Sequence, residues 1–483
     1  MTKRYRLVES NLSGQIIVHH ISRHFLTITG TDGPRRVHYR KCGSGPVVLM
    51  VHQSPRSSAE YEGLMRDWAP YFTCIAPDTP GFGQSDPLAK SDPDINDYAD
   101  AIVEFADALG LERVAAYGFH SGAIILVTAL KRRPDVFTCI AAGGYAIWTP
   151  EEMAIFGERY IPPFLPSSYG EHLTWMWNRI LEQSWFFPWF DVRDQTRLSG
   201  AHDDPRRVHD IAMEMLDAGD AYRLGYGAVL RAPRDIPPPD AKTPPVLISA
   251  YDGDPLQAHI DRLGSMPAGW DACKLANIQD HQDMSRDFLQ RHALPLTAQL
   301  AEDDFQGFLR VETAQFCGLI HWRGSPADRV MLVPAPGRSI DLVDDGVMAM
   351  DPPGHGLSDG WTGNAPIIWG PWYDVIDQVR EHGNRTSVRH EALPEGDPER
   401  LYPDLTPDRH GTYLIRAWSV VRAQHFYAPW YEAGRATARA FDPVEVEPHR
   451  LALEHRALIK ASAAKAFHIA LSARRDDDDQ PRL

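Results

Sequence analysis

Short, uniformly apolar runs alternate with longer amphipathic stretches through the first part of the chain. The runs are Val47–Val51, Cys74–Pro77, Val114–Tyr117, Cys139–Ala142 and Val246–Ala250. Apolar runs of this length are typical of strands that are buried on both faces, and the stretches between them have helical periodicity. The pattern therefore predicts an α/β fold with a mostly parallel sheet, whose ligands should bind at the carboxyl ends of the strands.

An aromatic-rich, helix-like segment interrupts this alternation at about residues 148–239 and ends at Pro237-Pro-Pro239. We interpret the segment as a helical cap inserted over the sheet. Its large aromatic side chains are Trp175, Trp177, Trp185, Phe186, Phe187, Trp189 and Phe190. This surface suits a lid over an apolar or aromatic substrate, with Trp177 and Trp185 as candidate substrate-binding residues. It suits equally well the packing of one cap against another.

Three motifs of the first part of the chain recur later in the same order. Val37–Val51 is matched by Ile320–Val333, Asp78–Asp86 by Asp351–Asp359, and Phe186-Phe-Pro-Trp189 by Tyr427-Ala-Pro-Trp430. Chance similarity between aromatic-rich segments is the alternative, but the shared order and near-constant spacing favour an internal duplication. The second copy is shorter because it lacks the stretch that, in the first copy, predicts a strand, a tight turn and a helix up to Arg132.

The duplication divides the chain into three predicted parts. Residues 30–305 should form the complete domain with its cap, and residues 311–470 a truncated second copy with its own cap segment. Residues 471–483 include the like-charge block from Arg474 to Gln480, so we expect a disordered acidic tail there.

The tight turn of the first copy, Gly118-Phe-His-Ser-Gly122, lies between an apolar strand and a helix. It resembles the nucleophile elbow of the α/β-hydrolase family, in which small residues flank a strained turn. His52-Gln-Ser-Pro55 is similar to the oxyanion-hole segment of that family, and Asp78–Asp86 to the loop after its next strand. The resemblance covers roughly residues 30–300 and implies an α/β-hydrolase-type sheet with a helical cap.

The elbow-like turn is atypical because its central residue is His120, where most family members carry Ser, Cys or Asp. Centring the turn on His120 puts glycine two residues to either side, where a Cβ atom would clash. Centring it on Ser121 would put Phe119 and Ala123 at those positions. We therefore place His120 at the apex, and leave open whether His120 or Ser121 is the reactive group.

The resemblance also implies the remaining catalytic positions. Asp254 follows Val246–Ala250 where the family carries its acid, with Asp252 as a second candidate. His281 follows a likely strand near residues 271–276, where the family carries its general base, and Asp254 could orient it through one ring nitrogen. His292 is the alternative base.

The same resemblance assigns an oxyanion site to the backbone N–H groups of Ser121 and Gln53, with the Gln53 side chain and His52 nearby. His120 lies at the start of a helix, whose dipole disfavours a positive charge, so we expect a neutral imidazole.

Three functions remain open from these residues. In the first, His120 or Ser121 attacks a carbonyl group, which gives acyl transfer or hydrolysis of an ester, amide or C–C bond. In the second, His120 and His281 work as general acid and base in a lyase-type reaction. In the third, the altered apex marks a non-catalytic protein that binds a ligand. We favour a hydrolase that acts on a small apolar or aromatic carbonyl compound.

Composition excludes several other classes of protein. The 483 residues include 49 Lys and Arg against 65 Asp and Glu, and the resulting net charge of −16 opposes binding to nucleic acid. No apolar run is long enough to span a membrane. The basic residues of Met1–Arg6 are followed by polar ones, so we do not expect export. Five scattered cysteines suit a reduced, cytoplasmic protein.

We expect no cofactor, because no glycine-rich nucleotide-binding motif follows a strand. We expect no metal either, because the cluster of His19, His20 and His24 has no further ligand at suitable spacing. The expected partner is a small-molecule substrate. The second copy should be catalytically silent and pack cap against cap with the first, imitating a homodimer. Whether the chain also forms homo-oligomers is left open.

Overall fold

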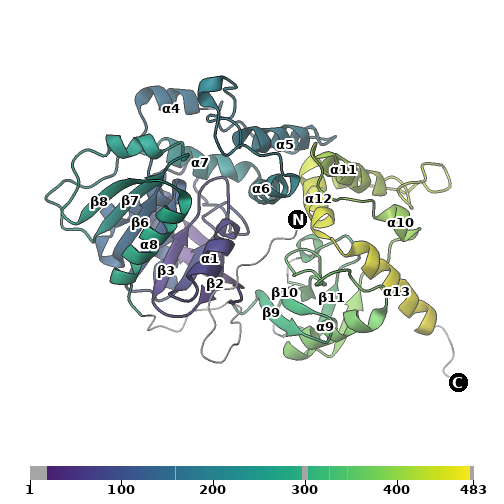
Figure 1. The fold of residues 1–483 in the computed structure, drawn as a ribbon. Coiled ribbons are helices and arrows are strands. Elements are labelled where there is room, and N and C mark those ends of the chain that lie inside the picture. The colour runs from purple at the N-terminus through teal and green to yellow at the C-terminus, as the bar shows by residue number, and fades with distance from the viewer. Residues whose placement is uncertain (1–18, 158, 296–302, 326, 345, 479–483) are drawn as a thin grey trace. The chain divides into compact units, whose positions relative to one another are not determined.

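The computed structural model of the protein describes residues 19–157, 159–295, 303–325, 327–344 and 346–478. The chain divides into two compact units, each of which is described by itself (Figure 1). Unit 1 comprises Met1–Pro163, Asp191–Gly200 and Asp217–Glu302, and unit 2 comprises Phe164–Phe190, Ala201–Leu216 and Asp303–Leu483.

Unit 1 is built on an eight-stranded mixed sheet in the order β1-β2-β4-β3-β5-β6-β7-β8. Its strands are β1 (Ser22–Gly30), β2 (Gly33–Gly43), β3 (Val47–Val51), β4 (Thr73–Pro77), β5 (Val114–Phe119), β6 (Phe137–Gly143), β7 (Val246–Tyr251) and β8 (Trp270–Leu275). Strand β2 runs antiparallel to β1 and β4. From β4 to β8 every neighbouring pair is parallel. The five apolar runs in the sequence all form strands, as predicted.

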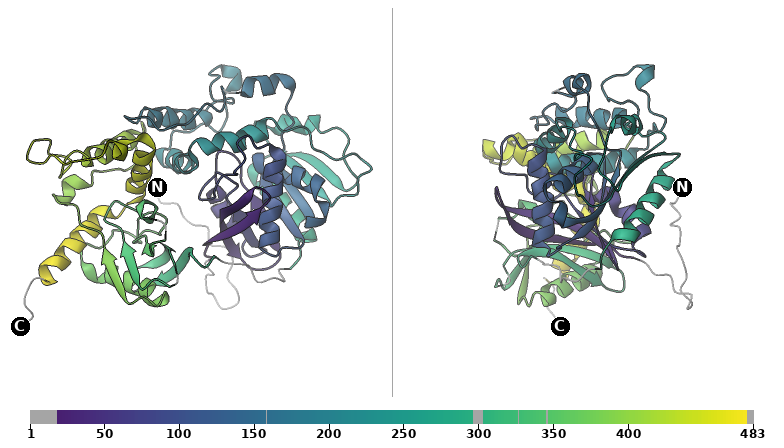
Figure 2. Two further views of the ribbon diagram at one scale, coloured as in Figure 1. Left: turned by 180° about the vertical axis from the view of Figure 1, so that it is seen from behind. Right: turned by 90° about the vertical axis from the view of Figure 1, so that its left-hand side faces the viewer.

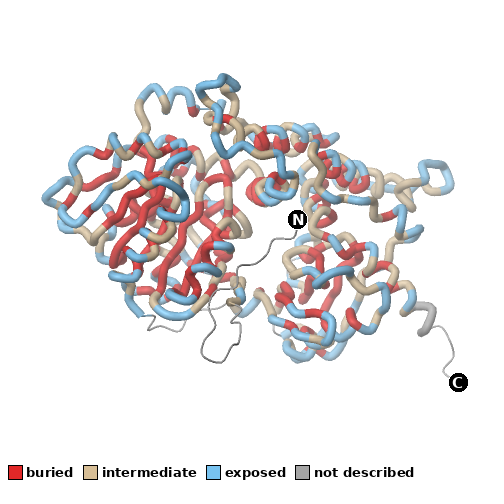
Figure 3. The backbone as a smooth tube through the Cα atoms, viewed as in Figure 1, coloured by how far each residue is buried: buried red, intermediate tan, exposed pale blue. Residues whose placement is uncertain are grey.

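Helices cover both faces of this sheet. They are α1 (Glu62–Trp68), α2 (Ile95–Ala108), α3 (Ser121–Arg132) and α8 (Ile278–His292). The segment between β6 and β7 adds α4 (Pro150–Phe156) and α7 (Tyr222–Leu230) to unit 1. Helices α1 and α8 lie on the face that is towards the viewer in Figure 1, and α2 and α3 lie on the opposite face, which Figure 2 shows from behind. The central strands are consequently buried along their length (Figure 3), and all five residues of β3 are buried. This is why continuous apolar runs form these strands.

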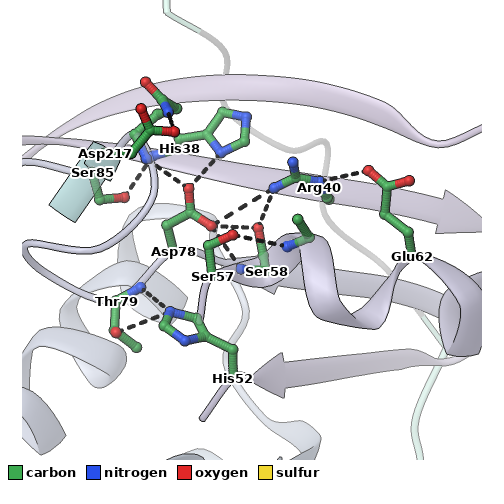
Figure 4. A network of polar contacts seen from close by, with 12 residues as sticks. His38, Arg40, His52, Ser57, Ser58, Glu62, Asp78, Thr79, Ser85 and Asp217 are labelled. Atoms are coloured by element: carbon green, nitrogen blue, oxygen red, sulfur yellow. Dashed lines mark hydrogen bonds and ion pairs between the residues drawn. The ribbon is translucent and has the colours of Figure 1, made fainter. Parts of the chain in front are cut away.

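A buried carboxylate ties together the loops at the carboxyl ends of β3 and β4 (Figure 4). Asp78 directly follows β4 and accepts hydrogen bonds from His38 Nδ1 at 2.8 Å, the Ser58 backbone N–H at 2.8 Å and the Gln84 backbone N–H at 2.9 Å. Burial opposes ionisation of this carboxyl, but His38 and Arg40 hold its pKa below the usual value. The network thus fixes the loops beside the candidate site.

Unit 2 has a five-stranded sheet in the order β13-β11-β12-β10-β9. The strands are β9 (Gln306–Glu312), β10 (Cys317–Arg323), β11 (Val330–Val333), β12 (Ala349–Met350) and β13 (Ser387–His390). Its helices are α5 (Glu171–Gln183), α9 (Trp369–His382), α10 (Pro398–Leu401), α11 (Thr412–Gln424), α12 (Pro448–Lys460) and α13 (Ala464–Asp478), together with most of α6 (Pro205–Ala218). Strand β11 is parallel to both β12 and β13.

A second buried carboxylate in unit 2 repeats the contacts of the first. Asp351 follows β12 and accepts hydrogen bonds from His321 Nδ1 at 2.9 Å and from the Ile340 backbone N–H at 2.9 Å. The corresponding donors to Asp78 in unit 1 are His38 of β2 and the backbone N–H of Ser58, in the 3-10 helix after β3. Ile340 likewise begins the 3-10 helix after β11.

Helices α5 and α11, both within unit 2, pack against each other through matching contacts. Trp177 Nε1 donates to the Arg409 carbonyl oxygen at 3.2 Å, and Trp418 Nε1 donates to the Ser168 carbonyl oxygen at 3.2 Å. The indole N–H of each tryptophan is therefore hydrogen-bonded to a carbonyl oxygen of the loop that precedes the other helix.

Each tryptophan ring also covers the glycine that caps the other helix. Gly411 precedes α11 with a φ of 66° and lies under Trp177, and Gly170 precedes α5 with a φ of 84° and lies under Trp418. A Cβ atom on either glycine would approach the facing indole ring closely. Glycine is thus needed at both positions, for the left-handed backbone and for the close approach.

The end of the chain corrects one expectation. Helix α13 continues to Asp478, so the backbone is helical over residues 471–478, where a disordered tail was expected. Residues 479–483 lie outside the described residues. Within the described ranges, no helix is both long enough and apolar enough to cross a membrane.

Candidate active site

The connection between β5 and α3 is a sharp turn with His120 at its apex. His120 has a φ of 48° and a ψ of −109°, a conformation that is uncommon for a residue other than glycine, and it directly precedes the first residue of α3. A Cβ atom on Gly118 would collide with the backbone of Gly122, and one on Gly122 would collide with the carbonyl oxygen of Val51. The two flanking glycines therefore allow the backbone to turn at His120.

The side chain of His120 meets a buried carboxylate at the end of β7. His120 Nε2 lies 3.0 Å from Asp254 Oδ1, which also accepts the Leu256 backbone N–H at 2.9 Å. The His120 side chain is 23% exposed, whereas that of Asp254 is fully buried. Asp252, the second candidate for the acid, is exposed. The buried Asp254 carboxylate thus orients the imidazole of His120, while part of the ring remains exposed to solvent.

Two further features secure this pair. Burial opposes the charged form of Asp254, but His120 and the Leu256 N–H hold the pKa of that carboxyl below its usual value. Gly144, with a φ of 54°, lies beside both side chains, and a Cβ atom there would crowd His120 Nε2 and Asp254 Oδ2. Asp254 Oδ2 is buried and has no hydrogen-bond partner among the described residues.

His281 does not take the predicted place. It lies in the first turn of α8, is buried, and pairs through Nδ1 with Ser249 Oγ at 2.9 Å and through Nε2 with Tyr117 Oη at 3.0 Å. Burial lowers the pKa of His281 to about 4, which keeps the ring neutral near pH 7. The expectation that Asp254 orients His281 is wrong, because both ring nitrogens bond elsewhere and Asp254 bonds His120. The alternative base, His292, lies at the end of α8.

Ser121, the other candidate for the reactive group, is buried with 3% of its surface exposed. Its Oγ accepts a hydrogen bond from the Ser54 backbone N–H at 3.1 Å. The hydroxyl therefore braces the loop after β3, and it is not presented to solvent as a nucleophile would be.

The expected oxyanion donor on Gln53 is already engaged. Its backbone N–H donates to Glu60 Oε1 at 2.7 Å, and its side-chain Nε2 donates to Glu60 Oε2 at 2.9 Å. The prediction that the Gln53 N–H holds an oxyanion is wrong in this conformation. Of the two backbone donors expected from sequence, the one on Ser121 remains at the N-terminus of α3.

Glu60 is a residue of the site that sequence reasoning missed. Its side chain is 7% exposed and lies 4.0 Å from Arg56 Nη1. Burial raises the pKa of Glu60, although Arg56, Gln53 and the nearby His120 each lower it. The only signal in the sequence is a glutamate in the turn that follows the oxyanion-like segment, which no spacing rule singles out.

His52 is also placed differently from the expectation. It is 1% exposed, and its Nε2 accepts the Thr79 backbone N–H at 2.9 Å (Figure 4). Its Nδ1 lies 2.9 Å from the Gln53 carbonyl oxygen. A ring that is held on both sides in this way links the loops after β3 and β4. The expectation that His52 belongs to the oxyanion and substrate-binding site is therefore wrong.

The two tryptophans named as substrate-binding residues have their observed contacts within unit 2. Trp177 is 1% exposed and packs against α11, so its predicted role in substrate binding is wrong. Trp185 donates through Nε1 to the His202 carbonyl oxygen at 2.7 Å, and Arg409 lies over its ring. In the described part of the chain, no three His, Cys, Asp or Glu side chains gather in an arrangement that could hold a metal ion.

The sheet order, the covering helices and the turn at His120 define the class of fold: unit 1 has the alpha/beta hydrolase fold. Residues 46–157 match the family described as alpha/beta hydrolase fold. This segment includes β3, β4, β5 and the turn at His120.

Curated relatives match the same part of the chain. Haloalkane dehalogenase 2 of Mycobacterium bovis is 32% identical over 120 residues, which are 25% of this chain and 42% of that protein. The 2-(acetamidomethylene)succinate hydrolase of Mesorhizobium japonicum is 34% identical over 121 residues, 25% of this chain and 43% of that protein. The chain thus spans about two fifths of the length of these relatives. Among solved structures, the epoxide hydrolase of Vigna radiata is 18% identical with a TM-score of 0.42, over 56% of this chain and 98% of its own.

Proposed function

We propose that unit 1 is a cofactor-independent hydrolase of small apolar or aromatic carbonyl compounds, in which His120 is the general base. The observation that carries this proposal is the 3.0 Å contact between His120 Nε2 and the buried Asp254 carboxylate. With Nε2–H donating to Asp254, Nδ1 is the basic nitrogen, and it has no hydrogen-bond partner among the described residues. A buried carboxylate in this position orients the ring and stabilises the imidazolium that forms when the ring takes a proton.

In the proposed reaction, His120 Nδ1 removes a proton from a water molecule while the water oxygen attacks the carbonyl carbon of the substrate. The carbonyl π electrons move to oxygen, and we assign the stabilisation of that charge to the backbone N–H groups of Ser121 and Gly122 at the start of α3. When the tetrahedral intermediate collapses, the leaving group takes the proton back from His120. The enzyme forms no covalent bond, so it needs no serine nucleophile.

The proposed substrate class follows from the surroundings of His120. The Phe119 ring stacks on the imidazole with ring centroids 4.2 Å apart, and Tyr251 stacks on Phe119 at 6.0 Å. Such a wall favours an apolar or aromatic acyl group over a charged one. The name of one curated relative, a hydrolase, supports hydrolysis as the class of reaction.

A second candidate function is general acid and base catalysis of a lyase type. It is favoured by the hydrogen bond from the Gln53 backbone N–H to Glu60, because a reaction without a tetrahedral oxyanion does not require that donor. His120 would then remove a proton from the substrate itself. The expected partner, His281, is unsuited because both of its ring nitrogens are bonded in the core.

We further propose that unit 2 contains a truncated, catalytically silent copy of the same fold, which with the first copy imitates a homodimer. The repeated contacts around Asp78 and Asp351 support a common origin. The reciprocal contacts of Trp177 and Trp418 between α5 and α11 support a two-fold arrangement of the cap helices, since the same residue types meet from both sides.

The hydrolase proposal is tested by measuring turnover of a panel of uncharged aryl and alkyl esters. We expect hydrolysis that His120→Ala abolishes, that Asp254→Asn lowers strongly and that Ser121→Ala retains. His281→Gln is the matched histidine control, which should affect stability more than turnover. Turnover that persists in His120→Ala would contradict the proposal. Correct folding of all variants with no turnover of any ester would favour the lyase or the non-catalytic function.

A further inference from the structure

Unit 2 contains a cavity of about 620 Å³. It is lined by the loop after β11 (Ala335–Arg338), the loop after β13 (Glu391–Glu395), and residues of α11 and α12. Because β11 and β13 are parallel and adjacent, the cavity lies at the carboxyl ends of neighbouring parallel strands. This is the position at which open α/β sheets bind ligands, and the volume is in the range of small-molecule sites.

The residues that line the cavity include no counterpart of the turn at His120. In unit 1 one of the two strands parallel to β3 is β5, which leads into His120. In unit 2 one of the two strands parallel to β11 is β13, which leads into Glu391. Glu391 Oε2 accepts the Ala335 backbone N–H at 2.9 Å and Arg338 Nε at 2.9 Å. The Ala335 backbone N–H is thus occupied, as the Gln53 backbone N–H is in unit 1. Since no counterpart of the turn at His120 lies among the lining residues, we treat the cavity as a binding site.

One part of the cavity wall is apolar and aromatic. It includes Leu342, Leu401, Tyr402, Val420, Trp430 and Leu458. Trp430 Nε1 is satisfied by the Leu401 carbonyl oxygen at 3.1 Å, which leaves its ring as apolar surface. Rings and branched aliphatic chains in this combination favour a flat hydrophobic ligand.

Six of the charged groups that line the cavity are paired with one another, and the two others, Glu395 and Arg439, are exposed. His425 Nε2 lies 2.9 Å from Glu454 Oε2, and its Nδ1 lies 3.4 Å from Glu445 Oε2. The hydrogen bond to Glu454 outweighs burial and raises the pKa of His425, which favours the protonated ring. Arg450 faces Glu454 at 3.8 Å, and Arg338 pairs with Glu391. A charged ligand would have to compete with one of these pairs, so the cavity favours an uncharged one.

We propose that this cavity of unit 2 binds an uncharged, largely aromatic small molecule and leaves it unchanged. The aromatic body contacts Tyr402 and Trp430, and a single polar group reaches the cluster of Gln424, His425 and Glu454. The binding is independent of the chemistry at His120.

The test uses three fluorescent probes of one shape and different charge: 2-naphthol, 2-naphthoate and 2-naphthylmethylamine. Their binding to the full-length protein is measured by equilibrium dialysis at pH 7. Ala392→Trp places an indole on an exposed position that lines the cavity, and Ala433→Trp places one on an exposed position that does not line it. The difference between these two variants reports on the cavity alone, whatever the probes do in unit 1.

We expect 2-naphthol to bind more tightly than both charged probes, and Ala392→Trp to weaken its binding by about tenfold relative to Ala433→Trp, the loss of roughly one good contact. His120→Ala should leave the binding unchanged. Equal binding by the two tryptophan variants, a preference for either charged probe, or no binding of 2-naphthol would each overturn the proposal. Altered binding in His120→Ala would assign the probe to unit 1 and would also overturn it.

Discussion

The reciprocal contacts between α5 and α11 predict that one of two equivalent glycines is far more sensitive to substitution than the other. Both Gly411 and Gly170 have left-handed backbone, and an alanine there costs about 1–2 kcal/mol in strain. A Cβ atom on Gly411 would lie 2.5 Å from Trp177 Cγ and Cδ2, whereas one on Gly170 would lie 3.0 Å from Trp418 Cγ. The first distance forces the rings apart, and the second requires only a shift of a few tenths of an ångström.

Overpacking of a rigid indole costs about 1–3 kcal/mol, so Gly411→Ala should lose about 2–5 kcal/mol in total and Gly170→Ala close to the strain alone. Gly363→Ala is the matched control within unit 2, since it also has a positive φ but its Cβ atom would meet nothing within 4 Å. Hydrogen exchange measured by mass spectrometry on the peptide of α11 gives the local free energy of opening. Equal losses in Gly411→Ala and Gly363→Ala would refute the reasoning.

Three further predictions follow from the contacts described above. Trp177→Phe and Trp418→Phe each remove one indole hydrogen bond to a backbone carbonyl and part of a buried ring, so in urea unfolding each should cost more than about 1 kcal/mol, and no loss in either variant would contradict the packing. Asp254→Asn should lower kcat about 10²–10⁴-fold with little change in KM, since it alters the state of His120 and not substrate binding; an equal rise in KM would contradict this. Because the pKa of His425 is raised in the folded protein above its usual value of about 6.5, its contribution to stability is complete below that pH and is lost as the pH rises through the folded value. His425→Gln should flatten this decline in a thermal melt, and an unchanged pH dependence would show that the pair with Glu454 does not contribute.

The strands of unit 1 could be predicted from sequence because burial on both faces leaves a continuous apolar run. The run Val47–Val51 coincides with β3, and the run Val246–Ala250 falls within β7. The turn at His120 could be predicted because Gly118 and Gly122 lie two residues to either side of it, where a Cβ atom would clash with the backbone.

The partners of side chains were predicted less well. Sequence placed His281 near Asp254 by its order along the chain, but the direction of its ring depends on Ser249 and Tyr117, which lie on other strands. Glu60 was missed because its importance arises from the loop geometry that brings it to the backbone of Gln53. Neither relation leaves a periodic or spaced signal in the sequence.

The aromatic cap shows a third kind of limit. A cluster of tryptophans predicts a large contact surface, but the sequence does not state what covers it. In the structure Trp177 packs against α11, which agrees with the cap-packing alternative and not with the substrate-binding one.

The central claim, that His120 and not Ser121 carries the chemistry, is tested most directly by labelling the protein with a fluorophosphonate probe. The peptide that contains both residues is then analysed by mass spectrometry, with a known serine hydrolase in the same tube as a positive control. We expect no stable adduct on Ser121, because its buried hydroxyl accepts a hydrogen bond from the Ser54 backbone N–H. A stable adduct on Ser121 that disappears in Ser121→Ala would contradict the account and identify a serine nucleophile.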